Sequence, residues 1–214
     1  MGSPGPARPV SYDHAVARVT KKQEQFEATR RKLLRVARRL FATRGYGGTS
    51  VEDITRGAKV TRGALYHHFA SKEEIFRAVF EQLEQELVEQ SARATLAERR
   101  PDRRLEAGAN AFLDACLDRD VQQIVLLDAP SVLGWESWQE IDARYALAGL
   151  TAALQVAIDD GYLVKQPAEP LAHVLLGALN QAALVIARAE DVRAARAELG
   201  RTIKRLLDGL KRPK

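Results

Sequence analysis

Apolar and polar residues alternate along most of this chain with the spacing of one helix face. Apolar positions recur three and four residues apart in successive stretches, which is typical of α-helices with one buried side. No long alternating run of β-branched residues appears. The stretches and their breaks predict an all-α fold of about nine helices, at about 27–44, 50–57, 61–67, 71 onward, 102–118, 119–128, 137–159, 169–189 and 191–210.

Three helix starts are crowded into the stretch from Ser50 to Lys72. Thr49 or Ser50 can cap the first helix, because each has an acidic residue three positions on. Thr61 can cap the second helix and Ser71 the third. Two short helices joined by a tight turn form a helix-turn-helix, whose second helix enters the major groove of DNA.

The helix that begins at Ser71 keeps a continuous apolar face from Ile75 to Leu87. Such a long helix leaves the helix-turn-helix and enters the rest of the chain, so we place a domain boundary near residue 75, inside a helix. Residues 1–12 are rich in Pro and Gly and are expected to be disordered. Residues 13–26 are weakly amphipathic and are compatible with an extension of the first helix.

Charge is distributed unevenly between the two parts. Residues 1–70 carry 14 Lys or Arg against 5 Asp or Glu, whereas the remainder carries 19 against 23. A basic N-terminal module on a mildly acidic body is typical of a nucleic-acid-binding protein with a second domain. The alternative is a basic face that is merely solvated.

Several function classes lack their signatures. The single cysteine, Cys116, leaves no disulfide within the chain and no cysteine metal cluster, and it suits a reducing cytoplasm. The hydropathy pattern predicts no transmembrane helix and no secretory signal. The sequence contains no phosphate-binding glycine loop, zinc-protease motif or nucleophile elbow, and its four histidines lack ligand spacing. We therefore expect no enzyme activity, no catalytic residue, no metal and no cofactor.

The segment VEDITRGAKVTRGALYHHFASKEEIF resembles the DNA-binding signature of the TetR family of bacterial transcriptional regulators. The resemblance extends back through LLRVARRLFATRGYGGTS, and it departs mildly at Lys59, where Gly or Asn is common. It implies an N-terminal three-helix DNA-binding domain followed by a helical domain for ligand binding and dimerisation. The implied divisions are an arm at 1–26, disordered or helical, a helix-turn-helix domain at 27–74, and a ligand-binding and dimerisation domain at 75–214.

The helix-turn-helix supplies three kinds of DNA contact: hydroxyls, helix N-termini and cations. Arg62 is the candidate for reading a base, since arginine bonds guanine with two hydrogen bonds. Gly63 allows close approach, and Ala64 can touch a thymine methyl group. His68 remains open between packing and DNA contact. The complete set of expected DNA-binding residues is Thr49, Ser50, Thr61, Arg62, Gly63, Ala64, Tyr66, His67 and Lys72.

A basic arm ahead of the first helix can also lie along DNA. Arg18, Lys21 and Lys22 are its candidates, and a solvated extension is an equally good interpretation.

The resemblance further implies a ligand pocket among the central helices and a two-fold dimer. The helix at 169–189 is apolar on more than one side, which suits a subunit interface. The resemblance implies that this helix and the helix at 191–210 of each copy together form a four-helix bundle that joins the dimer. A central core helix of a monomer is the alternative. Candidate pocket residues, each also explicable as core or dimer contact, are Phe112, Cys116, Trp135, Trp138, Tyr145, His173, Asn180 and Gln181.

The expected function is that of a cytoplasmic repressor released from a palindromic DNA operator by a small hydrophobic or aromatic effector. The alternative is a regulator controlled by a protein partner, or an activator without a small-molecule ligand. A closed apolar cavity in the C-terminal domain would favour the first.

Overall fold

A computed structural model describes residues 12–212 of the protein, with side chains from residue 21 onward. The disorder expected before residue 12 lies outside the described residues. The elements are α1 (Tyr12–Arg44), α2 (Val51–Ala58), α3 (Arg62–His68), α4 (Lys72–Ala97), η1 (Pro101–Arg103), α5 (Arg104–Ala115), η2 (Val121–Asp128), α6 (Ala129–Val132), α7 (Trp135–Asp159), α8 (Ala168–Arg188) and α9 (Val192–Gly209). The predicted all-α fold is confirmed.

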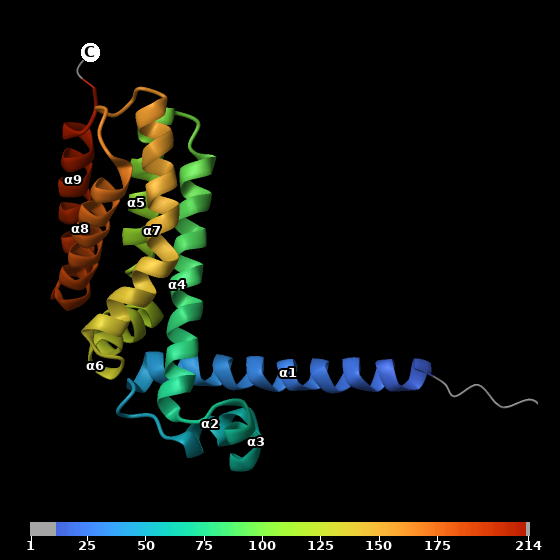
Figure 1. The fold of residues 1–214 in the computed structure, drawn as a ribbon. Helices are drawn as coiled ribbons and strands as arrows, with labels where there is room; N and C mark the ends of the chain where they lie inside the picture. Colours follow the sequence, from blue (N-terminus) through green and yellow to red (C-terminus); the bar gives the residue numbers. More distant parts are fainter. Residues whose placement is uncertain (1–11, 213–214) are drawn as a thin grey trace, which may run out of the picture.

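Figure 1 shows how these helices are arranged. α1 lies across the foot of the molecule, with α2 and α3 on its far side, and α4 rises from them along the side of a body made by α5, α7, α8 and α9. α1 begins earlier than the helix predicted at 27–44, so residues 12–26 are helical.

Local side-chain caps set the starts of the three crowded helices. The Ser50 hydroxyl accepts the N–H of Asp53 and the Asp53 carboxylate accepts the N–H of Ser50, which is a reciprocal capping box. The Thr61 hydroxyl accepts the N–H of Ala64 and caps α3, and the Ser71 hydroxyl accepts the N–H of Glu74 and caps α4. Lys59 ends α2 in the left-handed region at φ 51°, where a non-glycine residue is strained by about 1–2 kcal/mol.

The core runs without a break from the N-terminal helices into the body. Phe41, Ile54, Leu65 and Phe76 are buried among the first helices, and the same cluster continues through η2, α6, α7 and α8 to Leu184. A second cluster joins α5, α7, α8 and α9. α4 belongs to the first cluster over its N-terminal half, which makes it a rigid connection between the two parts.

The sequence predicts that the helix at 119–128 is broken at residues 128–131, and this prediction is wrong. The chain is helical from η2 into α6, and η2 is a π-helix, in which each N–H bonds the carbonyl five residues earlier. Pro130 has no N–H to give to the carbonyl of Val125. The indole N–H of Trp138 bonds that carbonyl instead, at 3.1 Å. A tertiary contact therefore satisfies the acceptor that the proline leaves open.

α8 is more apolar than the sequence analysis, which predicts no transmembrane helix, leads one to expect. By length and composition alone it is apolar enough to cross a membrane, and a third of its most apolar window is buried, at 33%. Core helices of soluble proteins pass the same test. Here α8 packs against α7, α9, α5 and η2, while Val174 and Val185 remain exposed.

Candidate DNA-binding surface and ligand cavity

α3 has one exposed polar side and one side that packs into the core. Leu65 and Phe69 are buried, as the sequence predicts for core residues, whereas Arg62, Tyr66 and His67 are exposed. These exposed side chains belong to a short helix at the foot of the molecule (Figure 1). This is the geometry of a recognition helix.

Arg62 is held above this surface by its neighbours. Its Nη1 lies 2.6 Å from Oε1 of Glu52, and its Nη2 donates to the hydroxyl of Tyr66 at 3.3 Å. The guanidinium carbon also lies 5.5 Å from the centre of the Tyr66 ring. The Tyr66 hydrogen bond raises the pKa of Arg62, and the charge on Glu52 acts in the same direction. Glu52 and Tyr66 therefore hold the exposed Arg62 side chain in place on the surface.

Gly63 leaves open space next to Arg62. A Cβ added there would have only the Thr61 hydroxyl nearby, at 4.0 Å. Internal packing therefore does not require glycine at this position, and close approach of a partner remains a sufficient reason for it. Ala64 is half-buried, and Thr61 accepts its N–H at 3.1 Å.

Thr49 is not placed for the expected DNA contact. It is 1% exposed, and its hydroxyl donates to the carbonyl of Gly45 at 2.9 Å. The helix cap falls one residue later, on Ser50, which is exposed. Of the two alternatives for this helix start, only Ser50 reaches the surface.

Lys72 is also more constrained than a free phosphate-binding cation. Its Nζ donates to the carbonyls of Tyr46 and Thr49, both at 3.0 Å. The ammonium lies 3.8 Å from the centre of the Tyr46 ring. Two of its three donors are therefore engaged in holding the loop before α2 against the start of α4, and one remains.

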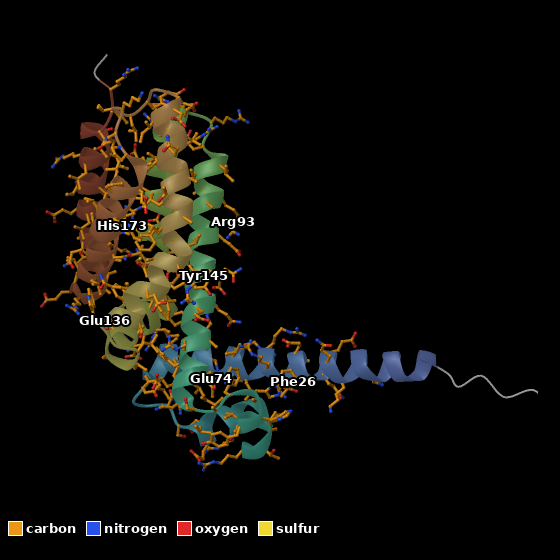
Figure 2. The ribbon with its side chains drawn as sticks, viewed as in Figure 1. Phe26, Glu74, Arg93, Glu136, Tyr145 and His173 are labelled. Carbon is orange, nitrogen blue, oxygen red and sulfur yellow. The ribbon has the colours of Figure 1, made fainter. Side chains whose placement is uncertain are left out.

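His68, left open by the sequence, packs inside. Its ring lies 4.1 Å from that of Phe26, and its Nδ1 is buried without a hydrogen-bond partner among the described residues. Burial lowers the pKa of His68, and the charges of His67 and Arg30 add to the effect. Figure 2 shows Phe26 on α1 beside the helix-turn-helix. Phe26 is a contact that sequence reasoning missed, because it lies in the weakly amphipathic extension.

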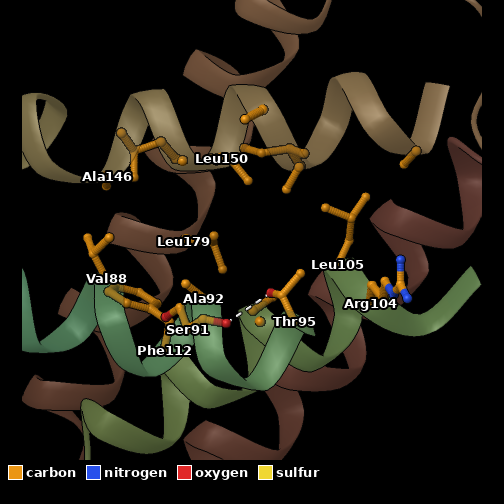
Figure 3. A pocket seen from close by; sticks show the side chains of 18 of the residues that line it. Val88, Ser91, Ala92, Thr95, Arg104, Leu105, Phe112, Ala146, Leu150 and Leu179 are labelled. Carbon is orange, nitrogen blue, oxygen red and sulfur yellow. Dashed lines mark hydrogen bonds between the residues drawn. The ribbon is translucent and has the colours of Figure 1, made fainter. Parts of the chain in front are cut away.

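The body contains a cavity of about 410 Å³ between α4, α5, α7, α8 and α9. Figure 3 shows it lined by apolar side chains, with Val88 and Ala146 toward one end and Arg104 at the other. The hydroxyls of Ser91 and Thr95 face it but donate to carbonyls of their own helix. The volume lies within the range of small-molecule sites, roughly 300–1,000 Å³.

Only one of the predicted pocket residues lines this cavity. Phe112 does so directly, and Asn180 reaches it through a 2.6 Å hydrogen bond to Asp142, which lines it. Cys116 and Tyr145 pack in the core instead. Their placement follows from helix rotation, which periodicity alone leaves undetermined.

The remaining candidate residues, Trp135, Trp138, His173 and Gln181, lie outside this cavity. Trp135 and Trp138 stack at the start of α7 with ring centres 4.8 Å apart, and the indole N–H of Trp138 donates to the carbonyl of Val125. His173 and Gln181 lie on the exposed side of α8. Figure 2 labels Tyr145 and His173, which come from α7 and α8.

Sequence reasoning missed two acidic residues in the cavity wall, Glu84 and Asp142. Their exposures are 3% and 7%. Burial raises the pKa of Glu84 well above its ordinary value, and the charge of Asp142 raises it further. Burial raises the pKa of Asp142 to about 6, although the Asn180 hydrogen bond opposes the shift. A signal existed: Glu84 stands at a core position of helical spacing, four residues after Phe80 and three before Leu87.

Comparisons with known proteins agree with this architecture. Residues 33–79 match the family model for bacterial regulatory proteins of the tetR family, and residues 103–210 match the tetracyclin repressor-like C-terminal domain. The chain is 33% identical to a TetR-family transcriptional regulator of Pectobacterium atrosepticum, with a TM-score of 0.80 over 89% of this chain and 98% of that one. The protein belongs to the TetR family and is a DNA-binding transcriptional regulator.

Two further similarities add detail. The chain is 28% identical over 157 residues to the transposon Tn10 TetC protein of Escherichia coli, which is 72% of this chain and 78% of that protein. It shares its fold with the regulator FadR of Bacillus subtilis, solved in complex with stearoyl-CoA, at 18% identity and a TM-score of 0.67 over 82% of this chain and 96% of that one.

Proposed function

We propose that the protein is a cytoplasmic, dimeric repressor that a small apolar effector releases from a palindromic operator. Residues 27–74 form its DNA-binding domain and residues 75–214 its ligand-binding and dimerisation domain. The observation that carries the proposal is α4, a single helix that starts in the DNA-binding module and ends in the cavity wall.

α4 supplies the mechanical path from cavity to DNA. It has 26 residues, so it is about 39 Å long. Lys72, at its start, bonds the loop before α2, and Val88, Ala92 and Thr95, near its end, line the cavity. A ligand that requires more room in the cavity displaces the helix as a whole, because packed helices move as rigid units.

A small displacement is sufficient for release. The two half-sites of a palindromic operator lie about 34 Å apart, one helical turn of DNA. Both recognition helices of a dimer must match that spacing, so a pivot of each α4 weakens binding. The effector must bind the mismatched state more tightly than the matched one.

The proposed DNA contacts lie on one surface. Arg62 reads a base, Gly63 and Ala64 allow close approach, and Ser50, Thr61, Tyr66 and His67 meet phosphates. Lys72 contributes its remaining N–H to a phosphate. Lys21 and Lys22 are exposed on the extension of α1, where a phosphate contact remains a proposal.

The proposed dimer interface is the exposed side of α8, together with α9. Val174 and Val185 are 69% and 44% exposed, and Leu206 of α9 is 49% exposed. A Cβ on Gly177 would meet nothing within 4 Å. Positions 174, 177, 181 and 185 follow one another three and four residues apart, so they form one stripe. Three of these positions, Val174, Gly177 and Val185, are small or apolar and Gln181 is polar, a composition that suits a four-helix bundle between two copies.

A small-molecule effector is favoured over control by a protein partner because the body contains a cavity. A filled core would have favoured the partner. FadR, which shares this fold, binds stearoyl-CoA, so the architecture is compatible with an apolar ligand.

Selection of bound DNA from a random pool, followed by salt titration, tests the proposal. We expect a palindrome with half-sites about one helical turn apart and a steep loss of affinity with salt. Adding apolar effectors to the selected complex should then release the protein. Enrichment of no sequence, with salt-insensitive binding, would contradict the recognition surface, whereas enrichment of a single half-site would contradict the dimer.

A further inference from the structure

Two buried carboxyl groups share one wall region of the cavity. Glu84 comes from α4 and Asp142 from α7, and both line the cavity. Asp142 accepts a 2.6 Å hydrogen bond from Nδ2 of Asn180. Among the described residues, the Glu84 carboxyl has neither a hydrogen-bond partner nor an ion pair, although Glu84 is only 3% exposed.

The residues around Glu84 and Asp142 supply no positive charge to balance these two carboxyls. Leu87, Phe112 and Leu176 line the same cavity, and the nearby thiol of Cys116 has its pKa raised to about 12 by burial and by Glu84. Arg104, the cationic side chain that lines the cavity, lies at the end away from Val88 and Ala146 (Figure 3), which follow Glu84 and Asp142 by one helical turn. Its Nε donates to the carbonyl of Glu98 at 3.3 Å. A buried acid without a partner is costly unless a ligand supplies the opposite charge.

We infer that the cavity binds an amphiphilic amine, whose ammonium group lies between Glu84 and Asp142 and whose apolar part extends along α4 toward Thr95 and Leu105. This inference rests on the proposed function and names the chemical class of its effector.

The chemistry favours a single positive charge with an apolar tail. An ammonium group donates hydrogen bonds that the two carboxyls can accept in a region of low dielectric, where charge-assisted bonds are strong. A carboxylate or phosphate head group would meet like charge at the same place. A neutral head group leaves the acids uncompensated. The apolar lining along α4 and α7 then accommodates the tail.

Binding is coupled to a proton. The titratable groups near Glu84 are Asp142 from α7 and the Cys116 thiol at the end of α5, and Asn180 from α8 donates to Asp142. On another side of α4, Glu86 pairs with Arg38 outside the cavity. Burial and the charge of Asp142 raise the pKa of Glu84. A cation between the two carboxyls stabilises their ionised forms and lowers the pKa of each, so binding releases a proton at any pH where either carboxyl is partly protonated in the free protein.

A matched ligand series tests the inference on the full-length protein. Decylamine, decanol and decanoate share one tail and differ in head-group charge, and each is titrated by calorimetry at neutral pH. We expect decylamine to bind at least about tenfold more tightly than decanol, a difference of one decade in Kd, with decanoate weakest. Equal or tighter binding of decanol or decanoate would overturn the inference.

The variants Glu84→Gln and Asp142→Asn keep side-chain shape, and in each variant one of the two carboxyls can no longer ionise to face the ammonium group. Each is expected to lower decylamine affinity about tenfold or more and to leave decanol affinity unchanged. Glu89→Gln is the control, since it removes the same charge from the exposed side of α4. Unchanged decylamine affinity in both cavity variants would contradict the inference.

A measurement on the unmodified protein remains decisive if a variant fails to fold. Decylamine is titrated in buffers of different ionisation enthalpy, and we expect net proton release on binding. Absence of proton release near pH 6, where Asp142 is about half protonated in the free protein, would contradict an ammonium group between the two carboxyls. Release of operator DNA is measured separately. If decylamine binds without releasing DNA, the proposed effector role is contradicted. If decanoate releases DNA and decylamine does not bind, only the ligand class inferred here is contradicted.

Discussion

The backbone N–H of Tyr46 donates a 2.7 Å hydrogen bond to Oδ2 of Asp128, which joins the loop before the helix-turn-helix to the base of the body. The other oxygen of Asp128 accepts from Nε2 of Gln123 at 2.9 Å. The Tyr46 carbonyl and ring hold Lys72. The DNA-binding module is therefore connected to the body by this polar contact as well as by α4.

Asp128→Ala should weaken that connection. The substitution leaves a half-buried N–H without its acceptor, which costs about 1–2 kcal/mol of unfolding free energy, as measured by urea denaturation. The change in DNA affinity on effector binding should also decrease. Gln123→Ala keeps the Tyr46 hydrogen bond and serves as the control. An Asp128→Ala protein with unchanged stability and unchanged coupling would show that this contact does not transmit the signal.

Arg62→Ala should relax specificity at one base position of each half-site by roughly ten- to a hundredfold, because a bidentate contact to guanine is lost. Binding of a panel of single-base operator variants measures the effect. Glu52→Gln is a useful companion, since it frees Arg62 from its ion pair and removes a negative charge, so DNA binding should tighten. Uniform weakening across all bases in Arg62→Ala would instead identify Arg62 as a phosphate contact.

Lys72→Ala should weaken binding to all sequences alike and lower the salt slope by about 1, because one phosphate contact is lost. It should also lower the unfolding temperature, since two carbonyls lose their donor. Lys165→Ala removes the same charge from an exposed loop of the body and should change neither property. Loss of stability without any change in the salt slope would assign Lys72 a purely structural role.

Glu84→Gln should change how stability depends on pH. A carboxyl whose pKa is raised on folding stabilises the folded protein below its unfolded pKa, and this contribution is lost as pH rises through the folded value. The ordinary pKa of Glu84 is 4.5, and its folded pKa lies well above. The variant should therefore match the unmodified protein near pH 4 and increasingly exceed its unfolding free energy as the pH rises above that value.

Denaturant unfolding across this pH range measures the difference between the two proteins, and Glu89→Gln again serves as the control. Curves that stay parallel at all pH values would mean that Glu84 has the same pKa folded and unfolded.

Val174→Asp should shift the protein from dimer to monomer, because the proposed α8 interface would bury an unpaired charge. Sedimentation over a range of concentrations should show dimerisation weakened at least about tenfold. Val164→Asp is the control, since Val164 is 43% exposed in the loop between α7 and α8. A dimer that persists in Val174→Asp would place the interface on another surface.

The sequence by itself determined the local structure of the helix-turn-helix. Ser50, Thr61 and Ser71 cap helices that begin within one residue of their predicted starts. A cap is a bond between a side chain and a backbone group three residues away, so its partners are visible in the sequence. The all-α class followed from periodicity, and the family from a motif confined to one short segment.

Tertiary structure decided what depends on partners distant in the sequence. Pro130 does not end its helix, because Trp138 satisfies the carbonyl that the proline leaves open. Thr49 turns inward, the tryptophans lie outside the cavity, and Glu84 enters its wall. Periodicity indicates which side of a helix is buried, but not which neighbour it meets. A cavity exists only where several helices fail to fill the space between them, and that depends on their packing together.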